Sequence, residues 1–216
     1  MGVYLVSVDA ADWRGTDEGG YGEIASAFDD ELRRRGLPPF DHVGQVGRSR
    51  SLASASAFVS AFVSASVSVS VSAPVSAFEE KLSPSMLGFA ALCRARLTRE
   101  EEDLLCDWSV LVPVPLERTV ELPIGSAYTD TTVVAGAPQV LALAQRLASV
   151  IGLPPELPVP DTNLALTSWF LDGAAKRWAD ARPGPWSADL DTAFYVALYR
   201  RAAQHALSRG CPLTFC

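Results

Sequence analysis

The helix that decides the fold reads DLDTAFYVALYRRAAQHALSR over residues 189–209. Leu190, Phe194 and Leu198 recur at four-residue steps, so they lie on one face of an α-helix. Gly210 follows them and is typical of the left-handed residue at which many helices end. A long helix with this apolar face needs a partner layer to cover it.

The rest of the chain supplies that layer as short strands and further helices. The amphipathic pattern predicts helices over residues 23–35, from 85, from 98, over 138–151 and over 165–179, and strands over residues 3–8, 108–114, 120–122 and 212–215. Thr98 and Glu101 form a capping-box pattern. We therefore expect an α+β fold: a small mixed sheet covered by about five or six helices, with a helix-rich C-terminal half, in a single globular domain over residues 1–216.

One segment, residues 49–77, departs from this pattern because it is rich in Ser, Ala and Val, and Arg50 is its only charge. The strict alternation at residues 66–72 indicates a strand, whereas Phe58 and Phe62 stand at helical spacing. The segment is interpreted as a low-complexity insertion within the domain. Three interpretations of the segment stay open: a flexible insertion, an internal hairpin or helix, and a dimerisation strand. The third would make the protein a homodimer.

Composition and charge narrow the class of partner. The chain has 18 Lys and Arg against 25 Asp and Glu, a formal net charge of −7. Since phosphate binding requires a basic cluster, nucleic acid is not expected as a partner. The charges are too evenly distributed for a spanning helix, so no membrane is expected either. The first residues read as a strand and not as a leader, so we expect a cytoplasmic protein.

The cysteines and histidines show no metal-ligand spacing. His42 and His205 stand apart from the cysteines, none of which forms a CxxC pair, so we predict no metal site and identify no cofactor. Unpaired structural thiols are the preferred interpretation. His205 lies four residues from both Arg201 and Arg209, which favours a solvated helix face. The cysteines are Cys93, Cys106, Cys211 and Cys216.

An acidic glycine-rich loop at residues 15–23 is the first candidate site, because ligand loops of α/β proteins often join a strand to a helix. The loop lacks a phosphate-binding glycine motif, and its acids would repel a phosphate. A hard divalent cation suits the carboxylates better. A tight turn before an acidic helix N-terminus explains the same residues without a ligand. The candidate binding residues are Asp9, Asp17, Glu18, Tyr21 and Glu23.

Two further positions complete the candidates. Tyr128 and Asp130 lie in a polar loop before a helix N-terminus, where they would bind a polar ligand or merely cap the helix. Trp186 lies in a Pro-Gly-Pro-Trp loop and would either line a pocket or pack as a staple on the last helix. Packing as a staple is the favoured interpretation.

A resemblance is carried by the start Met1-Gly-Val-Tyr-Leu5, the turn Pro123-Ile-Gly-Ser126 leading to Gly136-Ala-Pro138, and the Phe194 to Ala203 stretch before Gly210. These features resemble the YfbM-like bacterial family of unknown function, and the whole chain resembles conserved hypothetical proteins of actinomycetes. The resemblance implies a mixed fold and carries over no catalytic residue.

We expect a protein- or small-ligand-binding domain without catalysis. One alternative is a small metal-assisted enzyme built on the acidic loop with Tyr128 and Asp130. Another is an immunity-like or regulatory partner of a basic protein, since most of the net negative charge falls in residues 1–108. Whether the chain is an enzyme stays open.

Overall fold

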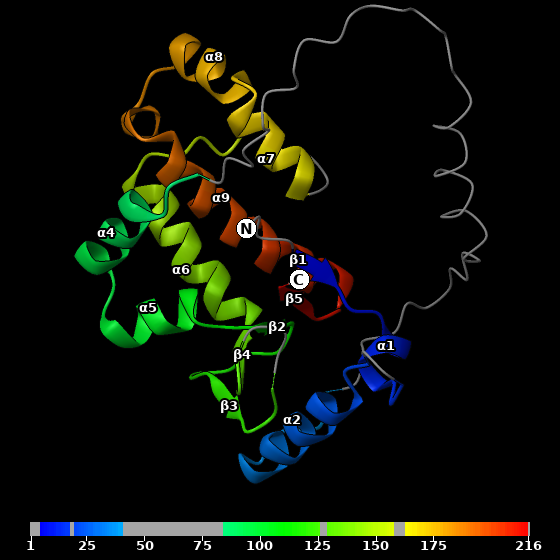
Figure 1. The fold of residues 1–216 in the computed structure, drawn as a ribbon. Helices are drawn as coiled ribbons and strands as arrows, with labels where there is room; N and C mark the ends of the chain where they lie inside the picture. Colours follow the sequence, from blue (N-terminus) through cyan, green and yellow to red (C-terminus); the bar gives the residue numbers. More distant parts are fainter. Residues whose placement is uncertain (1–4, 18–19, 41–83, 126–128, 158–162, 216) are drawn as a thin grey trace, which may run out of the picture. The chain divides into compact units, whose positions relative to one another are not determined.

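The computed structural model shows a five-stranded mixed sheet with helices on both of its faces (Figure 1). It describes residues 5–17, 20–40, 84–125, 129–157 and 163–215, and the low-complexity segment 49–77 lies outside these ranges. All described elements belong to one unit of the chain. The α+β class and the helix-rich C-terminal half are confirmed. The described helices number eight, more than the five or six expected.

The sheet has the strand order β1-β5-β2-β4-β3. Only β2 and β4 run parallel, and every other neighbouring pair is antiparallel. Strands β1 and β3 therefore form the edges of the sheet, and each has only three residues, which limits the edge that another chain could pair with. The strands are β1 (Leu5–Ser7), β2 (Val110–Val112), β3 (Val120–Leu122), β4 (Thr132–Gly136) and β5 (Leu213–Phe215).

The side chains along each strand alternate between the two faces of the sheet, and the core therefore consists of two clusters. Leu111 and Ala135 face the cluster formed with the C-terminal helices. Val110 and Val134 face the other cluster, formed with the N-terminal helices. Successive strand residues point to opposite faces, so a single strand serves both cores. The helices are α1 (Ala10–Arg14), α2 (Gly22–Arg34), α4 (Leu87–Arg96), α5 (Arg99–Cys106), α6 (Ala137–Val150), α7 (Asn163–Leu171), α8 (Ala174–Ala181) and α9 (Leu190–Arg209).

The predicted C-terminal helix is confirmed as α9, which packs against α4, α6 and α7 as well as β2. Its cap residue Asp189 accepts the backbone amide of Thr192 at 3.0 Å. Gly210 ends the helix at a φ of +62°, in the left-handed region. Because neighbours surround α9, residues on several of its sides are buried, including Ala193, Tyr195 and Ala202.

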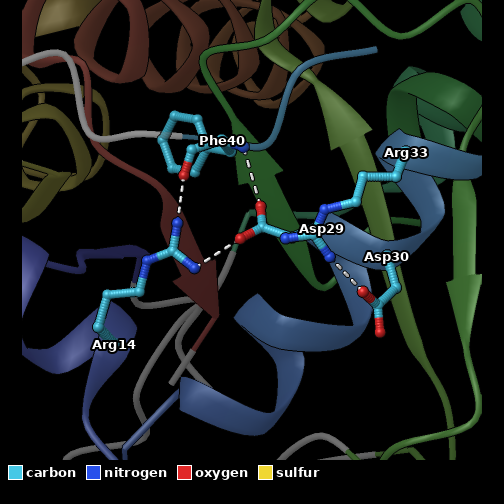
Figure 2. Close-up of polar contacts among 5 residues, drawn as sticks. All are labelled: Arg14, Asp29, Asp30, Arg33 and Phe40. Carbon is cyan, nitrogen blue, oxygen red and sulfur yellow. Dashed lines mark hydrogen bonds and ion pairs between the residues drawn. The ribbon is translucent and has the colours of Figure 1, made fainter. Parts of the chain in front are cut away.

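On the opposite face of the sheet, α1 and α2 are joined by a buried carboxylate (Figure 2). Asp29 of α2 accepts a hydrogen bond from Arg14 of α1 at 2.6 Å and one from the backbone amide of Phe40 at 2.8 Å. Its side chain is only 7% exposed. Both carboxylate oxygens thus have partners, which is what a buried charge requires.

Three elements differ from the sequence-based expectation. Residues 10–14 form α1, an element that the sequence pattern does not predict, because this helix, capped by Asp9, is too short to show a period. Residues 132–136 form β4, the parallel partner of β2, and not the end of a polar loop. The helix expected over 165–179 is two helices, α7 and α8, separated by Gly173 at a φ of +78°.

The remaining predicted elements are confirmed, including the capping box of α5, where Thr98 and Glu101 bond each other's backbone amides. Among the described helices, none combines the length with the apolar composition that crossing a bilayer requires.

Candidate functional site

The acidic glycine-rich loop folds back tightly on α1. The Gly22 amide donates to the Gly15 carbonyl at 2.8 Å, and the Tyr21 amide donates to the Asp12 carbonyl at 3.0 Å. A methyl group at Gly20 would overlap the Gly15 carbonyl. Glycine is needed there because two stretches of backbone approach each other closely.

Two of the residues predicted for a site in this loop have structural roles. One carboxylate oxygen of Asp9 accepts the backbone amides of Ala11 and Asp12, each at 2.8 Å, and so caps α1. The Tyr21 ring stacks on Trp13 with the centroids 6.3 Å apart. Asp9 therefore caps α1, and Tyr21 packs the loop against that helix.

Asp17 and Glu23 do lie together, around a hollow of about 590 Å³ that Asp30 and Ile124 also line. We call it the acidic hollow. Asp30 pairs with Arg33 of the same helix at 2.5 Å, as Figure 2 shows. Within the described ranges, no three His, Cys, Asp or Glu side chains are grouped so that they could hold a metal ion. Glu18 lies outside the described residues.

The other predicted site residues do not join this hollow. Asp130 is exposed and is not among the described residues that line it, and Tyr128 lies outside the described ranges. Trp186 is only 2% exposed, and its ring lies 5.7 Å from that of Trp178, centroid to centroid. Trp186 belongs to the same buried cluster as residues of α9, which agrees with the favoured interpretation of a staple on the last helix.

A second pocket, which the sequence reasoning missed, lies between α9 and the ends of β1, β2, β4 and β5. It encloses about 370 Å³. We call it the aromatic pocket. Its lining residues come from six separate stretches of the chain: Leu5, Met86, Cys106, Asp107, Trp108, Ser109, Thr129, Thr131, Val133, Tyr195, Leu198, Tyr199 and Phe215.

Contacts among aromatic rings fix the walls of this pocket. Trp108 stacks on Phe215 with the centroids 4.5 Å apart and meets Tyr199 edge-on at 6.2 Å. Phe89 stacks behind Tyr199 at 5.3 Å. The indole nitrogen of Trp108 donates to the Leu105 carbonyl at 2.9 Å. The rings are therefore held by the protein itself.

Most of the hydroxyls around the pocket already have internal partners. The Ser109 hydroxyl accepts the Val133 amide at 2.9 Å and so joins the start of β2 to β4. The Tyr195 hydroxyl donates to the Pro84 carbonyl at 2.8 Å. The Thr129 hydroxyl donates to the Thr131 carbonyl. The carboxylate of Asp107 and the thiol of Cys106 are the remaining groups of chemical interest.

Asp107 is the only charged residue among the described residues that line the aromatic pocket. Partial burial raises its pKa, and the neighbouring carboxylate of Asp103 raises it further. Arg99 counteracts this effect, but it pairs with Asp103 at 2.9 Å. Asp107 is exposed, so solvent screens part of its charge, but no basic side chain stands among the described residues that line the pocket.

Cys106 and Cys93 form a thiol pair between α5 and α4. The Cys106 thiol donates to the Cys93 sulfur, and this bond, burial and nearby negative charges all raise the pKa of Cys106. Both are free thiols, as is Cys211, in agreement with the predicted unpaired cysteines; Cys216 lies outside the described residues. A raised pKa keeps Cys106 protonated at neutral pH, so it is a weak nucleophile.

The solvated face predicted at His205 is confirmed only in part, since Arg209 is exposed whereas Arg201 and His205 are partly buried. His205 is half-buried and shares a hydrogen bond of 2.8 Å with Ser7 of β1. Burial lowers its pKa, and Arg209 and Arg201 lower it further. Ser7 and His205 are 198 positions apart, so no local pattern could reveal the contact.

Comparisons with protein-family models, with curated proteins and with solved structures gave no match. The resemblance to the YfbM-like family stays a prediction.

Proposed function

We propose that this protein binds a small, mainly apolar molecule in the aromatic pocket. The observation that carries the proposal is that four aromatic residues and one acidic residue line a single cavity. The four are Trp108, Tyr195, Tyr199 and Phe215. A volume of about 370 Å³ lies in the range of small-molecule sites, which are mostly apolar with a few polar groups.

The rigidity of the walls supports the proposal. Trp108 and Tyr195 each donate a hydrogen bond to a backbone carbonyl, at 2.9 Å and 2.8 Å. Rings held in this way lose little conformational entropy when a ligand arrives, so more of the contact energy is available for binding.

The rim of the pocket offers a route of entry. Met86 is 43% exposed, and Thr129 and Thr131 are also exposed. Met is a flexible side chain that adapts to ligands of different shape. A molecule can therefore reach the rings without unfolding of α9 or the sheet.

The proposal is tested by thermal unfolding against a set of small aromatic and aliphatic compounds. A ligand present at 100 times its Kd should stabilise the protein by about 2.7 kcal/mol. In Thr131→Trp, the new ring occupies the rim and should abolish the shift. Asp130→Trp is the matched control, because Asp130 is the adjacent exposed residue and does not line the pocket.

Two outcomes would contradict the proposal. If Thr131→Trp shows the same stabilisation as the wild type, the compound binds elsewhere. If no compound of the set stabilises the wild type, the pocket is a packing gap. The metal-assisted enzyme and the partner of a basic protein stay predictions from the sequence, since no contact among the described residues favours either.

A further inference from the structure

The charges around the aromatic pocket select among ligand classes. Among the described lining residues there is one carboxylate, Asp107, and no Lys, Arg or His. An anionic ligand would lose its hydration there without gaining a partner, which is costly in an apolar site. Only a neutral or a cationic ligand fits this set of groups.

The surroundings of Asp107 favour the cation. Asp107 follows directly on α5 and caps its C-terminus, where the helix dipole contributes further negative potential. Asp103 lies one helical turn away, close enough to hydrogen-bond to Asp107, and Glu102 adds to the potential. Within the described part of the chain, no ion pair joins Asp107 to a basic side chain. A cation placed beside Asp107 would relieve this repulsion.

The rings supply the second element of recognition. Aromatic rings attract organic cations through their electron-rich faces, most strongly where water is partly excluded. Trp108 is adjacent to Asp107 in sequence, and Tyr199 contacts Trp108 edge-on. The pKa of Tyr199 is raised, mainly by burial, so its ring stays neutral at physiological pH. Asp107, Trp108 and Tyr199 thus line the same cavity.

We propose that the ligand is an organic amine: an apolar body that fills the aromatic pocket, with an ammonium group that pairs with Asp107. This inference rests on the proposed function, since it names the class of molecule that the same pocket binds. The ammonium group would donate to the carboxylate, a charge-assisted hydrogen bond that a neutral analogue cannot make with equal strength.

Calorimetric titration with three probes of similar shape tests the inference: phenethylamine, phenethyl alcohol and phenylacetate. We expect the wild type to bind the amine at least about tenfold more tightly than the alcohol, and phenylacetate most weakly. Asp107→Asn should remove the preference for the amine and change the affinity for the alcohol less than about twofold. Asp130→Asn, an exposed acid outside the pocket, should keep the preference.

The outcomes separate the two proposals. If amine and alcohol bind the wild type equally, or Asp107→Asn keeps the preference, the amine inference is wrong while ligand binding stands. If Thr131→Trp leaves the affinity for the probes unchanged, binding occurs elsewhere and both proposals fail. If none of the three probes binds, the amine inference is wrong, and the wider compound set of the thermal-unfolding test decides ligand binding itself. Thermal unfolding of each variant shows whether it is folded, and Asp107→Asn should be as stable as the wild type because it relieves repulsion with Asp103.

Discussion

Trp108 and Phe215 stack with their ring centroids 4.5 Å apart, and this contact joins a residue two positions before β2 to the last residue of β5. Trp108 is 3% exposed and Phe215 is partly exposed. The antiparallel register of β2 and β5, with Val110 opposite Thr214, sets the two rings side by side. A sheet contact between distant parts of the chain thereby forms a wall of the aromatic pocket.

The buried carboxylate of Asp29 should be essential for stability. In Asp29→Asn the side chain loses its charge and with it the ion pair to Arg14, so we expect a loss of about 2 kcal/mol in the free energy of unfolding. Urea denaturation measures it.

Asp30→Asn is the control for this change, because Asp30 and Arg33 form an exposed pair on the same helix. Asp30→Asn should lower the free energy of unfolding by less than about 0.5 kcal/mol. Equal losses in the two variants would show that the burial of Asp29 has no energetic consequence.

The ion pair between Glu101 and Arg146 should make stability depend on pH. The Arg146 hydrogen bonds and the Thr98 amide hold the pKa of Glu101 at about 2, against an ordinary value of 4.5. The stabilisation is therefore fully present above pH 4.5 and is lost as the pH falls toward 2. Because Glu101 is 31% exposed on its side chain, solvent screening limits the effect to about 1 kcal/mol.

Glu101→Gln isolates this charge, since glutamine retains the capping hydrogen bond to Thr98. Urea denaturation at pH 6 and pH 3 should show a smaller acid-induced loss in Glu101→Gln than in the wild type. An identical loss in both proteins would assign the acid sensitivity to other carboxylates.

Gly88 should be intolerant of a side chain. A methyl group at Gly88 would overlap the Asp189 carboxylate and the Thr192 hydroxyl, which together cap α9. We expect Gly88→Ala to cost about 1 kcal/mol, because the cap must move. In Asp189→Ala the cap is already lost, so adding Gly88→Ala should reduce the stability less than it does in the wild type. Thermal unfolding of the wild type, the two single variants and the double variant measures this difference. Additive losses would contradict the contact.

His205 should titrate below its ordinary pKa of 6.5. Its neutral form is favoured in the folded state, so this contribution to stability is present above pH 6.5 and declines as the pH falls through the lowered pKa. Arg209→Gln should raise the pKa of His205, whereas Arg182→Gln should leave it unchanged. Histidine proton NMR measures both, and an unshifted pKa in the wild type would contradict the burial of the ring.

Local patterns in the sequence predict the long helices well. The apolar face and Gly210 define α9, and Thr98 with Glu101 defines the start of α5, because these signals depend on neighbours within one helical turn. Short helices and strands cannot be predicted in this way. In β4, Val133 to Ala135 form an apolar run too short to distinguish a strand from a helix.

The aromatic pocket could not be predicted for a related reason. Its rings come from residues 108, 195, 199 and 215, which only the strand order brings together. In the sequence, Tyr195 and Tyr199 read as core residues of a helix, and their burial agrees with that interpretation. That the same rings also border a cavity depends on how α9 packs on the sheet, which no single segment encodes.

Methyl NMR spectra of the protein titrated with phenethylamine test the central claim, ligand binding in the aromatic pocket, most directly. We predict that the methyl signals of Met86, Val133 and Leu198 shift, while those of Val134, on the opposite face of the sheet, and Ile124, at the acidic hollow, remain unchanged. Shifts at Ile124 or Val134, with Met86, Val133 and Leu198 unaffected, would contradict it.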